Sequence, residues 1–203
     1  MTVRKLHRIV GLVMLAPFMA WAITGAIFFI KPGYGGAYEA LAVKTYPIDA
    51  AVTLPSNPAW LEARYLKTAL GEHLLVRTAS GWKHLDAKTL DERPAPDESA
   101  LRALLADAFT ANPARYGHVA RVDGLEVTTD TGVHVTLNWP RLALAQRGPD
   151  TDRIDGIYKI HYLQWTGIAA VDKILGGVGL ALILVLSGLG VGLLLRSRGP
   201  GGK

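Results

Sequence analysis

The sequence predicts a membrane α+β protein, in which two transmembrane helices flank an extracytoplasmic domain built from a helix packed on an antiparallel sheet. Two runs of 22 residues each, 9–30 and 174–195, contain no charged residue. A helix rises about 1.5 Å per residue, so each run spans about 33 Å, enough for a hydrocarbon core of about 30 Å. The region between the runs holds one amphipathic helical pattern and several short segments separated by Gly-containing turns.

The basic residues indicate how the chain crosses the membrane. Of the 22 Lys and Arg residues, six lie in the two tails, which leaves 16 between the spans against 17 Asp and Glu. The positive-inside rule therefore places tails 1–8 and 196–203 in the cytoplasm. The pI of about 9.5 reflects the basic excess of these two tails, and we interpret it as a signal of topology. We expect the tails to contact the lipid bilayer, and we expect no nucleic-acid partner. The six cations are Arg4, Lys5, Arg8, Arg196, Arg198 and Lys203.

A cleaved signal peptide is the alternative interpretation of the first apolar run. Signal peptides carry an apolar region of about 7 to 15 residues followed by a small-residue cleavage site. This run is longer, and the sequence FFIKPGYGG at its end contains no Ala-x-Ala. An uncleaved anchor is therefore favoured. The absence of cysteine excludes disulfides, Fe–S ligation and thiol catalysis.

The first half of the central region, 31–156, favours strands. The segments ARYLKTAL, HLLVRTA and GWKHLDA are short and are separated by turns at Gly71-Glu72 and Ser80-Gly81. TYPIDAAVTL alternates loosely and is also predicted to be extended. Two units, 40–93 and 97–148, are one interpretation of this region, although the residues themselves show no convincing repeat.

The second half predicts a helix followed by a sheet. Asp97 is a suitable N-cap, and the apolar residues after it recur at helical spacing. HVARV and LEVTT flank Asp123-Gly124, which is a hairpin signal. VHVTLN and RLALAQ complete the expected antiparallel strands, with His134 on the face opposite to Val135. The helical stripe consists of Leu101, Leu104, Leu105, Ala108 and Phe109.

Most of the polar residues of the central region show no catalytic pattern. The sequence contains no Gly-x-Ser-x-Gly, no His-Glu-x-x-His and no phosphate-binding loop. We interpret the four central histidines as unpaired surface or half-buried residues, and the carboxylates in turns, Asp150 among them, as solvated. The four histidines are His73, His84, His118 and His134.

His7 and His161 differ from these four because each lies beside an apolar run. An ionisable side chain at a membrane span is often functional, and neutral imidazole is a common axial ligand of b-type haem. The segment IYKIHYLQWTG also fits an aromatic belt at the membrane surface, in the interfacial stretch 157–173, so an ordinary interfacial histidine is the alternative. His7 and His161 are therefore either interfacial residues or haem ligands.

Topology constrains the haem hypothesis. His7 is expected at the inner face and His161 at the outer face, about 30 Å apart, so the two cannot ligate the same iron. A homodimer, or a heteromer with other membrane helices, would supply the second ligand at each level. Gly25 and Gly188 leave room for a flat macrocycle beside the histidine of the opposite helix. Arg4 and Arg8 are expected to pair with haem propionates.

The two spans together resemble a known family. RKLHRIVGLVMLAPFMAWAITGAIFF resembles the first segment of PepSY-associated transmembrane proteins, with a basic residue, Leu-His, Gly, an apolar run and then Thr-Gly. IHYLQWTGIAAVDKILGGVGLALILVLSGLG resembles their second segment. The helix at 97–110 with its following hairpin is similar to the PepSY fold, so the resemblance covers nearly the whole chain.

The resemblance implies a bacterial inner-membrane protein with a periplasmic PepSY region. Larger members with four spans include ferric-siderophore reductases that bind b-type haem on both sides of the membrane, and the matching positions here are His7 and His161. This chain has two spans, so electron transfer requires a dimer or a partner, and a separate electron donor. Because PepSY regions are also linked to the regulation of extracytoplasmic peptidases, a non-enzymatic anchored module is the alternative. An accessory subunit of a larger complex is a third hypothesis.

Overall fold

The computed structural model describes residues 2–49 and 51–197. These residues form two compact units, one within Met1–Tyr34 and Asp152–Lys203 and the other within Gly35–Thr151. The cations Arg198 and Lys203 of the expected tail 196–203 lie outside the described residues.

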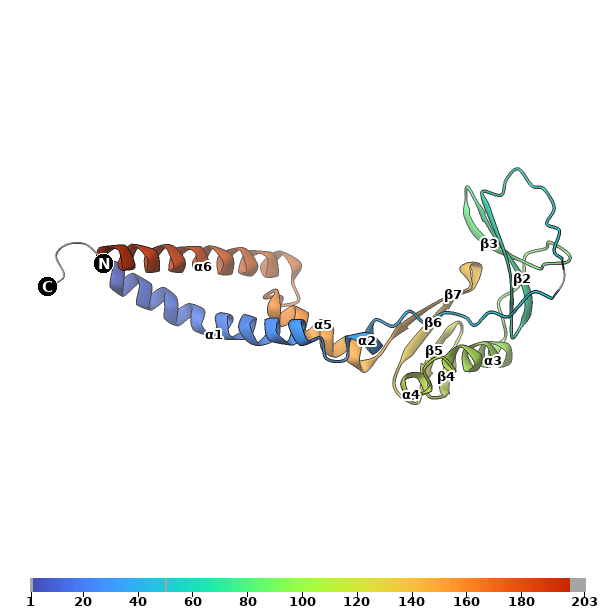
Figure 1. Ribbon diagram of the computed structural model, residues 1–203, viewed down its shortest axis with the longest axis horizontal. Helices are drawn as coiled ribbons and strands as arrows, with labels where there is room; N and C mark the ends of the chain where they lie inside the picture. The colour runs from blue at the N-terminus through green and yellow to red at the C-terminus, as the bar shows by residue number, and fades with distance from the viewer. Residues whose placement is uncertain (1, 50, 198–203) are drawn as a thin grey trace. The chain divides into compact units, whose positions relative to one another are not determined.

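The first unit is built on two long helices, α1 (Val3–Ile30) and α6 (Ala169–Ser197), which lie side by side (Figure 1). Both are long and apolar enough to cross a membrane. Each extends beyond the uncharged run, because a charge at a helix end leaves the backbone hydrogen bonds intact. Thr2 caps α1 by accepting a hydrogen bond from the backbone N–H of Lys5, and α1 ends at Lys31, whose φ is 53°.

A shorter helix, α5 (Pro149–His161), precedes α6 and places His161 at its own last position. The sequence patterns did not predict this helix, since its first half is rich in turn-forming polar residues. After α5 the chain enters a tight turn. In this turn the N–H of Gln164 donates to the carbonyl of Lys159, in the last turn of α5, over 2.8 Å.

The central unit contains two antiparallel sheets (Figure 1). The first sheet has the order β1-β2-β3, and its strands match three of the predicted segments. The prediction that TYPIDAAVTL is extended strand is wrong: within the described part of this segment only Tyr46 forms a bridge, to Lys67. Pro47 and Pro55 lack the N–H that a continuous ladder needs. The strands are β1 (Glu62–Thr68), β2 (Gly71–Thr78) and β3 (Gly81–Leu85).

The second sheet has the order β4-β5-β6-β7, and helix α3 (Glu98–Phe109) packs against it. Asp97 caps α3, as predicted, by accepting a hydrogen bond from the N–H of Ala100 over 2.8 Å. The predicted hairpin is also confirmed, with Asp123 paired to Glu126. The strands are β4 (Val119–Asp123), β5 (Glu126–Thr129), β6 (His134–Asn138) and β7 (Ala143–Arg147), and the short helices are α2 (Tyr34–Ala37), α4 (Pro113–Tyr116) and the 3₁₀ turn η1 (Trp139–Arg141).

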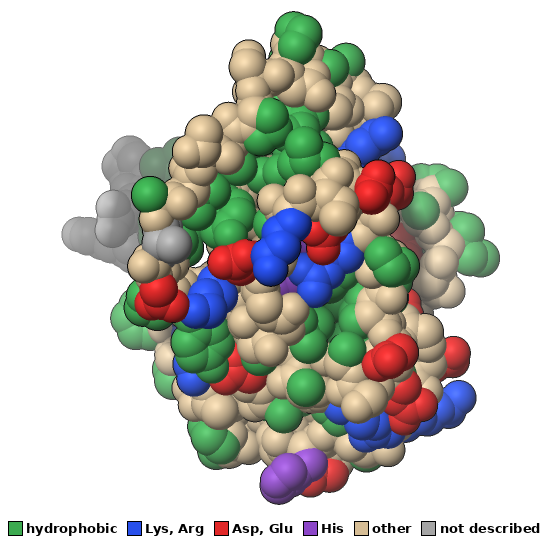
Figure 2. Space-filling view, turned by 90° about the vertical axis from the view of Figure 1, so that its right-hand side faces the viewer, with side chains coloured by type: hydrophobic (Ala, Val, Ile, Leu, Met, Phe, Trp, Pro, Cys, Tyr) green, Lys and Arg blue, Asp and Glu red, His purple; other side chains and the backbone are tan. Residues whose placement is uncertain are grey.

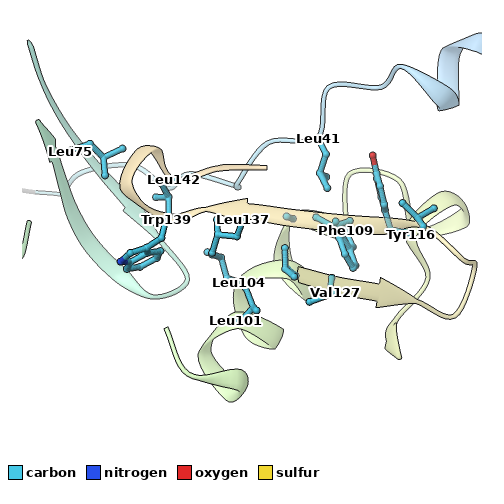
Figure 3. Close-up of a cluster of buried hydrophobic side chains, with 14 residues drawn as sticks. Leu41, Leu75, Leu101, Leu104, Phe109, Tyr116, Val127, Leu137, Trp139 and Leu142 are labelled. Carbon is cyan, nitrogen blue, oxygen red and sulfur yellow. The ribbon is translucent and has the colours of Figure 1, made fainter. Parts of the chain in front are cut away.

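One hydrophobic core joins helix α3 to both sheets (Figure 3). Leu101 and Leu104 of α3 are fully buried and face Val127 and Leu137 of the second sheet. Leu75 of β2 belongs to the same cluster, so the first sheet is attached through its own apolar face. The predicted α+β arrangement of helix on antiparallel sheet is therefore confirmed.

An ion pair closes the base of the central unit. The guanidinium of Arg115, on α4, contacts the carboxylate of Asp150 through both terminal nitrogens and donates to Gln146 over 2.7 Å. Gln146 in turn donates to the carbonyls of Ala37 and Glu39. The interpretation of Asp150 as a solvated turn carboxylate is wrong, because this hydrogen bond from Arg115 holds the pKa of Asp150 below its usual value.

The exposed surface of the central unit mixes charges of both signs with apolar side chains. Figure 2 shows acidic and basic groups interspersed on the face toward the viewer. Several form ion pairs, including Lys67 with Asp49 at 2.5 Å and Arg77 with Glu62 at 3.2 Å. Pairs of this exposed kind contribute little stability, about 0 to 1 kcal/mol each, so the core of α3 and the sheets carries the fold.

Replacement of Leu104 by Ala tests this assignment. Leu104 is fully buried, so Leu104→Ala leaves a cavity and is expected to lower the free energy of unfolding by about 2 to 5 kcal/mol. Leu61→Ala, at a side chain that is 61% exposed, is the matched control and should change it by less than about 0.5 kcal/mol. Near-UV circular dichroism of the full chain in detergent, followed through denaturation, measures both. Equal effects of the two substitutions would contradict the core described here.

Candidate functional site

His161 is held by two residues of α1 at the same time. The indole N–H of Trp21 donates to the backbone carbonyl of His161 over 2.6 Å. The hydroxyl of Thr24, one turn further along α1, lies 2.8 Å from the Nδ1 atom of the His161 imidazole. Trp21 satisfies a carbonyl that the end of α5 leaves without an intrahelical partner, while Thr24 fixes the ring. The position and the rotation of this imidazole are thus both set by α1.

The hydrogen bonds of Thr24 favour one tautomer of His161. The Thr24 hydroxyl lies 2.6 Å from the carbonyl of Ala20 and 3.3 Å from that of Trp21, and its single proton goes to this backbone. With the proton given to the backbone, the oxygen offers lone pairs to His161, and Nδ1 is the donor in the contact of 2.8 Å. In the neutral ring, Nε2 then carries a free lone pair. This is the tautomer in which imidazole ligates a metal through Nε2, with its other nitrogen held by a hydrogen bond.

Aromatic rings enclose His161 on two sides. Phe28 of α1 and Tyr162 meet the imidazole edge to face, with ring centroids at 5.0 and 5.4 Å. Tyr158 stacks on Phe28 at 4.4 Å and lies parallel to Tyr162 at 6.0 Å. The aromatic residues that the sequence indicates therefore form a packed cluster around a half-buried imidazole.

His7 lies near the other end of the pair formed by α1 and α6. Its Cε1 atom is 3.5 Å from where a Cβ on Gly190 would lie, so the ring lies beside this glycine of α6. The Nδ1 atom of His7 is buried and has no hydrogen-bond partner among the described residues. Such an unpaired buried nitrogen costs about 1 to 3 kcal/mol, and it would be satisfied by a ligand or a partner from outside the chain.

His7 and His161 are far apart, as the predicted topology requires. Thr24, which contacts His161, is 17 residues from His7 along the continuous helix α1, a rise of about 26 Å. The two imidazoles therefore belong to separate sites at opposite ends of the helix pair.

The structure also places the other expected site residues. Gly25 lies beside Thr24, and a Cβ added to it would meet no described atom of another element within 4 Å; the same holds for Gly188 on α6. Both are open to a neighbouring group. Arg4 and Arg196 line a cavity of about 300 Å³ at the start of α1 and the end of α6, whereas Arg8 is exposed on α1. No described residue pairs with Arg8 in an ion pair.

The spacing of residues on α1 carries a signal for this site that the sequence interpretation missed. His7, Met14, Trp21 and Phe28 recur every seven residues, and Thr24 falls on the same face. Met14 and Thr24 are buried although most of α1 is exposed. This heptad stripe marks the face of α1 that packs against the rest of the unit.

A second histidine pair lies buried in the central unit. The Nδ1 atom of His73, on β2, and the Nε2 atom of His84, on β3, are 2.8 Å apart, and both side chains are almost fully buried. The interpretation of these two histidines as unpaired surface or half-buried residues is wrong. They lie on neighbouring strands, and the antiparallel pairing of β2 with β3 brings them together.

The hydrogen-bond partners at the two ends of this pair, the carbonyl of Trp139 and the hydroxyl of Thr68, indicate the tautomer of each ring. His84 Nδ1 donates to the carbonyl of Trp139 over 2.9 Å, so the neutral ring accepts at Nε2 from His73 Nδ1, and the guanidinium of Arg93 lies 3.1 Å from the same Nδ1. His73 Nε2 then accepts from the hydroxyl of Thr68 over 2.7 Å. This relay links the first sheet to η1 beside the second. Neither lone pair stays free for a metal, and among the described residues no group of three or more His, Asp or Glu is arranged to hold one.

Burial keeps both of these histidines neutral. It lowers the pKa of His73 from 6.5 to about 3, with the nearby Arg93 guanidinium adding to the effect. Burial also lowers the pKa of His84 from 6.5 to about 4. Arg93 itself is anchored by donating to the carbonyls of Glu72 and Leu70.

Comparison with known proteins gives no relative for this arrangement. No family model matches the chain, and neither a curated protein nor a solved structure matches it.

The buried pair predicts a loss of stability in acid. The unfolded histidines bind protons near pH 6.5, whereas folded His84 and His73 bind them only near pH 4 and 3. The contribution of this neutral histidine pair to the free energy of unfolding should therefore be fully present above pH 6.5. As the pH falls toward 4 it should decline by about 1.4 kcal/mol per pH unit for each proton that only the unfolded chain binds. Thermal unfolding between pH 4 and 8 measures this, with circular dichroism as the readout.

The double substitution His73→Leu with His84→Leu is expected to flatten this pH dependence, since it removes both titrating groups. His118→Leu is the matched control, because His118 is 93% exposed and should leave the profile unchanged. An unaltered acid profile in the double variant would show that other groups cause the decline.

Proposed function

We propose that this chain is a bacterial inner-membrane protein of the PepSY-associated transmembrane type. In this proposal it binds b-type haem and passes electrons across the membrane as a homodimer or with a partner. Both tails are cytoplasmic and the central PepSY-like unit is periplasmic. The cationic tails flanking two long apolar helices support this orientation through the positive-inside rule.

The hydrogen bonding of His161 carries the proposal. An interfacial histidine with no ligand needs neither a fixed tautomer nor a fixed ring. Here Thr24 accepts from Nδ1 because its own proton is committed to Ala20, and Trp21 holds the backbone of the same residue. Nε2 is the nitrogen left to bind iron. The unpaired buried Nδ1 of His7 supports a second site at the other end.

The chain's own residues would hold haem b as follows. His161 and His7 would each supply one axial imidazole, at the outer and inner levels. Gly25 and Gly188 would leave space for the ring, and Arg4 and Arg8 would pair with propionates at the inner level. When bound, haem supplies a one-electron Fe(III)/Fe(II) couple. Phe28, Tyr158 and Tyr162 would exclude water at the outer level.

A second copy of the chain, or another membrane protein, would supply the second histidine that each haem site needs. One chain provides a single histidine at each level, so two chains provide a bis-histidine pair at both levels. The separate electron donor lies on the cytoplasmic side, and ferric iron or another oxidant is the acceptor outside. In the homodimer, the stoichiometry is two haems for two chains.

An absorbance spectrum tests the haem sites directly. Protein purified from haem-replete cells should show the reduced spectrum of b-type haem at about one haem per chain. His161→Ala and His7→Ala should each retain about half of this haem, and the double variant should retain none. His134→Ala is the matched control, at an exposed histidine of the central unit, and should keep the full content.

A colourless wild-type protein would contradict the proposal and would favour the anchored partner-binding module instead. Full haem content in His161→Ala would remove this residue from the site even if haem were bound elsewhere.

Thr24 is expected to act as a positioning residue for the His161 imidazole. Thr24→Val keeps the shape of the side chain but removes the acceptor for Nδ1–H, so the ring is free to change tautomer. Nitrogen-15 NMR of the imidazole in haem-free protein should show Nδ1–H in the wild type and a mixture of tautomers in Thr24→Val. The midpoint potential of the haem-loaded variant should shift as well, because a hydrogen bond to the ligand tunes the metal.

Thr24→Ser restores the hydroxyl and should restore the Nδ1–H tautomer and the potential. If Thr24→Ser behaved like Thr24→Val, or if wild-type His161 carried its proton on Nε2, the assignment of Thr24 would be wrong.

A further inference from the structure

We propose that the first unit contains a binding site for the headgroup of an anionic phospholipid. The site is a groove of about 900 Å³ formed by the end of α5, the turn 162–168 and the start of α6. This inference rests on the membrane placement proposed above and is independent of haem. The residues that carry it are Lys159, Tyr162, Trp165, Lys173, Gly176 and Gly177.

The groove presents the two positive charges of Lys159 and Lys173 beside one carboxylate, that of Asp172, so its net charge is positive. Lys159 of α5 and Lys173 of α6 both line it, and neither forms an ion pair with another described residue. Asp172 is the carboxylate that lines the groove, and it is buried. Its Oδ1 atom accepts from both the backbone N–H and the hydroxyl of Thr166, over 3.0 and 2.7 Å. The two lysines are therefore available to an anion.

These same contacts hold the turn in one shape. Thr166 is fixed to Asp172, and its own oxygen accepts from the N–H of Ile168 over 3.2 Å. Leu163 is buried against α6, where its Cδ1 atom lies 2.8 Å from where a Cβ on Gly179 would be placed. A larger residue at 179 would displace Leu163. The groove wall is thus ordered before any ligand binds, which lowers the entropy lost on binding.

The apolar residues around the groove identify a lipid as the source of the anion. Tyr162, Trp165 and Ile168 are 58, 55 and 60% exposed, in a short turn at the end of a membrane-crossing helix. Exposed aromatic and aliphatic side chains of this kind lie at the level of the lipid headgroups. A lipid phosphodiester at the level of these residues would lie close to the ammonium groups of Lys159 and Lys173.

The chemistry of the groove also selects among phospholipids. Phosphatidylethanolamine and phosphatidylglycerol share the phosphodiester, but the former carries an ammonium group. Two lysines and one carboxylate line the groove, so its positive excess repels that ammonium and favours a headgroup with a net negative charge. Gly176 and Gly177 leave the floor open, with no side chain of their own beside the headgroup. An anionic, glycerol-type headgroup fits these features.

Native mass spectrometry of the full chain in mild detergent, titrated with single phospholipids, tests the proposal. Phosphatidylglycerol should bind at lower concentration than phosphatidylethanolamine. Lys159→Gln and Lys173→Gln should each weaken phosphatidylglycerol binding about fivefold, and the double variant about 25-fold. Lys31→Gln is the matched control, at an exposed lysine that ends α1, and should change binding less than twofold.

Equal binding of the two lipids, or equal losses in Lys31→Gln and the double variant, would overturn the inference. Displacement of phosphatidylglycerol by millimolar inorganic phosphate would show a soluble-phosphate site and would overturn the lipid assignment. The absorbance of the same samples reports haem separately, so a colourless protein that retains phosphatidylglycerol contradicts the electron-transfer proposal alone.

Discussion

The attachment of His161 to α1 is the constraint on which the rest of the first unit depends. Trp21 and Thr24 bind its carbonyl and its imidazole, so the end of α5 is fixed against the C-terminal part of the long helix α1. The turn that follows must then reach the start of α6 within seven residues, 162–168. Asp172 holds that turn through Thr166. The aromatic cluster, the open groove and the approach of α6 to α1 all follow from this one attachment.

The central unit is stabilised differently, by hydrogen bonds between buried polar side chains at its edges and by an apolar core in its middle. At one edge Arg115 and Asp150 hold the two chain segments that enter and leave the unit. At the other edge the relay through His73 and His84 joins the first sheet to the turn after β6. Buried hydrogen bonds of this kind favour one arrangement, because a partner that loses its hydrogen bond carries a desolvation penalty.

Local patterns were sufficient for the elements whose physics is local. The apolar runs, the Asp97 cap, the Leu101–Leu104 stripe and the Asp123-Gly124 hairpin each depend on neighbours within a few residues, and all are present. Helix α5 was missed because its polar first half resembles a turn. Its second residue, Asp150, is held by Arg115, which lies 35 residues earlier in the sequence, so this contact has no local signal. In the described part of TYPIDAAVTL the expected strand is reduced to one bridge, from Tyr46 to Lys67, because Pro47 and the following Pro55 have no N–H to donate to a ladder.

By itself, the sequence determined the two membrane-length helices, the α+β class of the region between them, and the separation of His7 from His161 by nearly a bilayer thickness. Length, hydropathy and helical rise decide these properties. Only the tertiary structure decided which groups meet: Thr24 with His161, His73 with His84, and Arg115 with Asp150. Hydrogen bonds act over about 3 Å, and the approach of distant residues to that distance depends on packing of the whole unit.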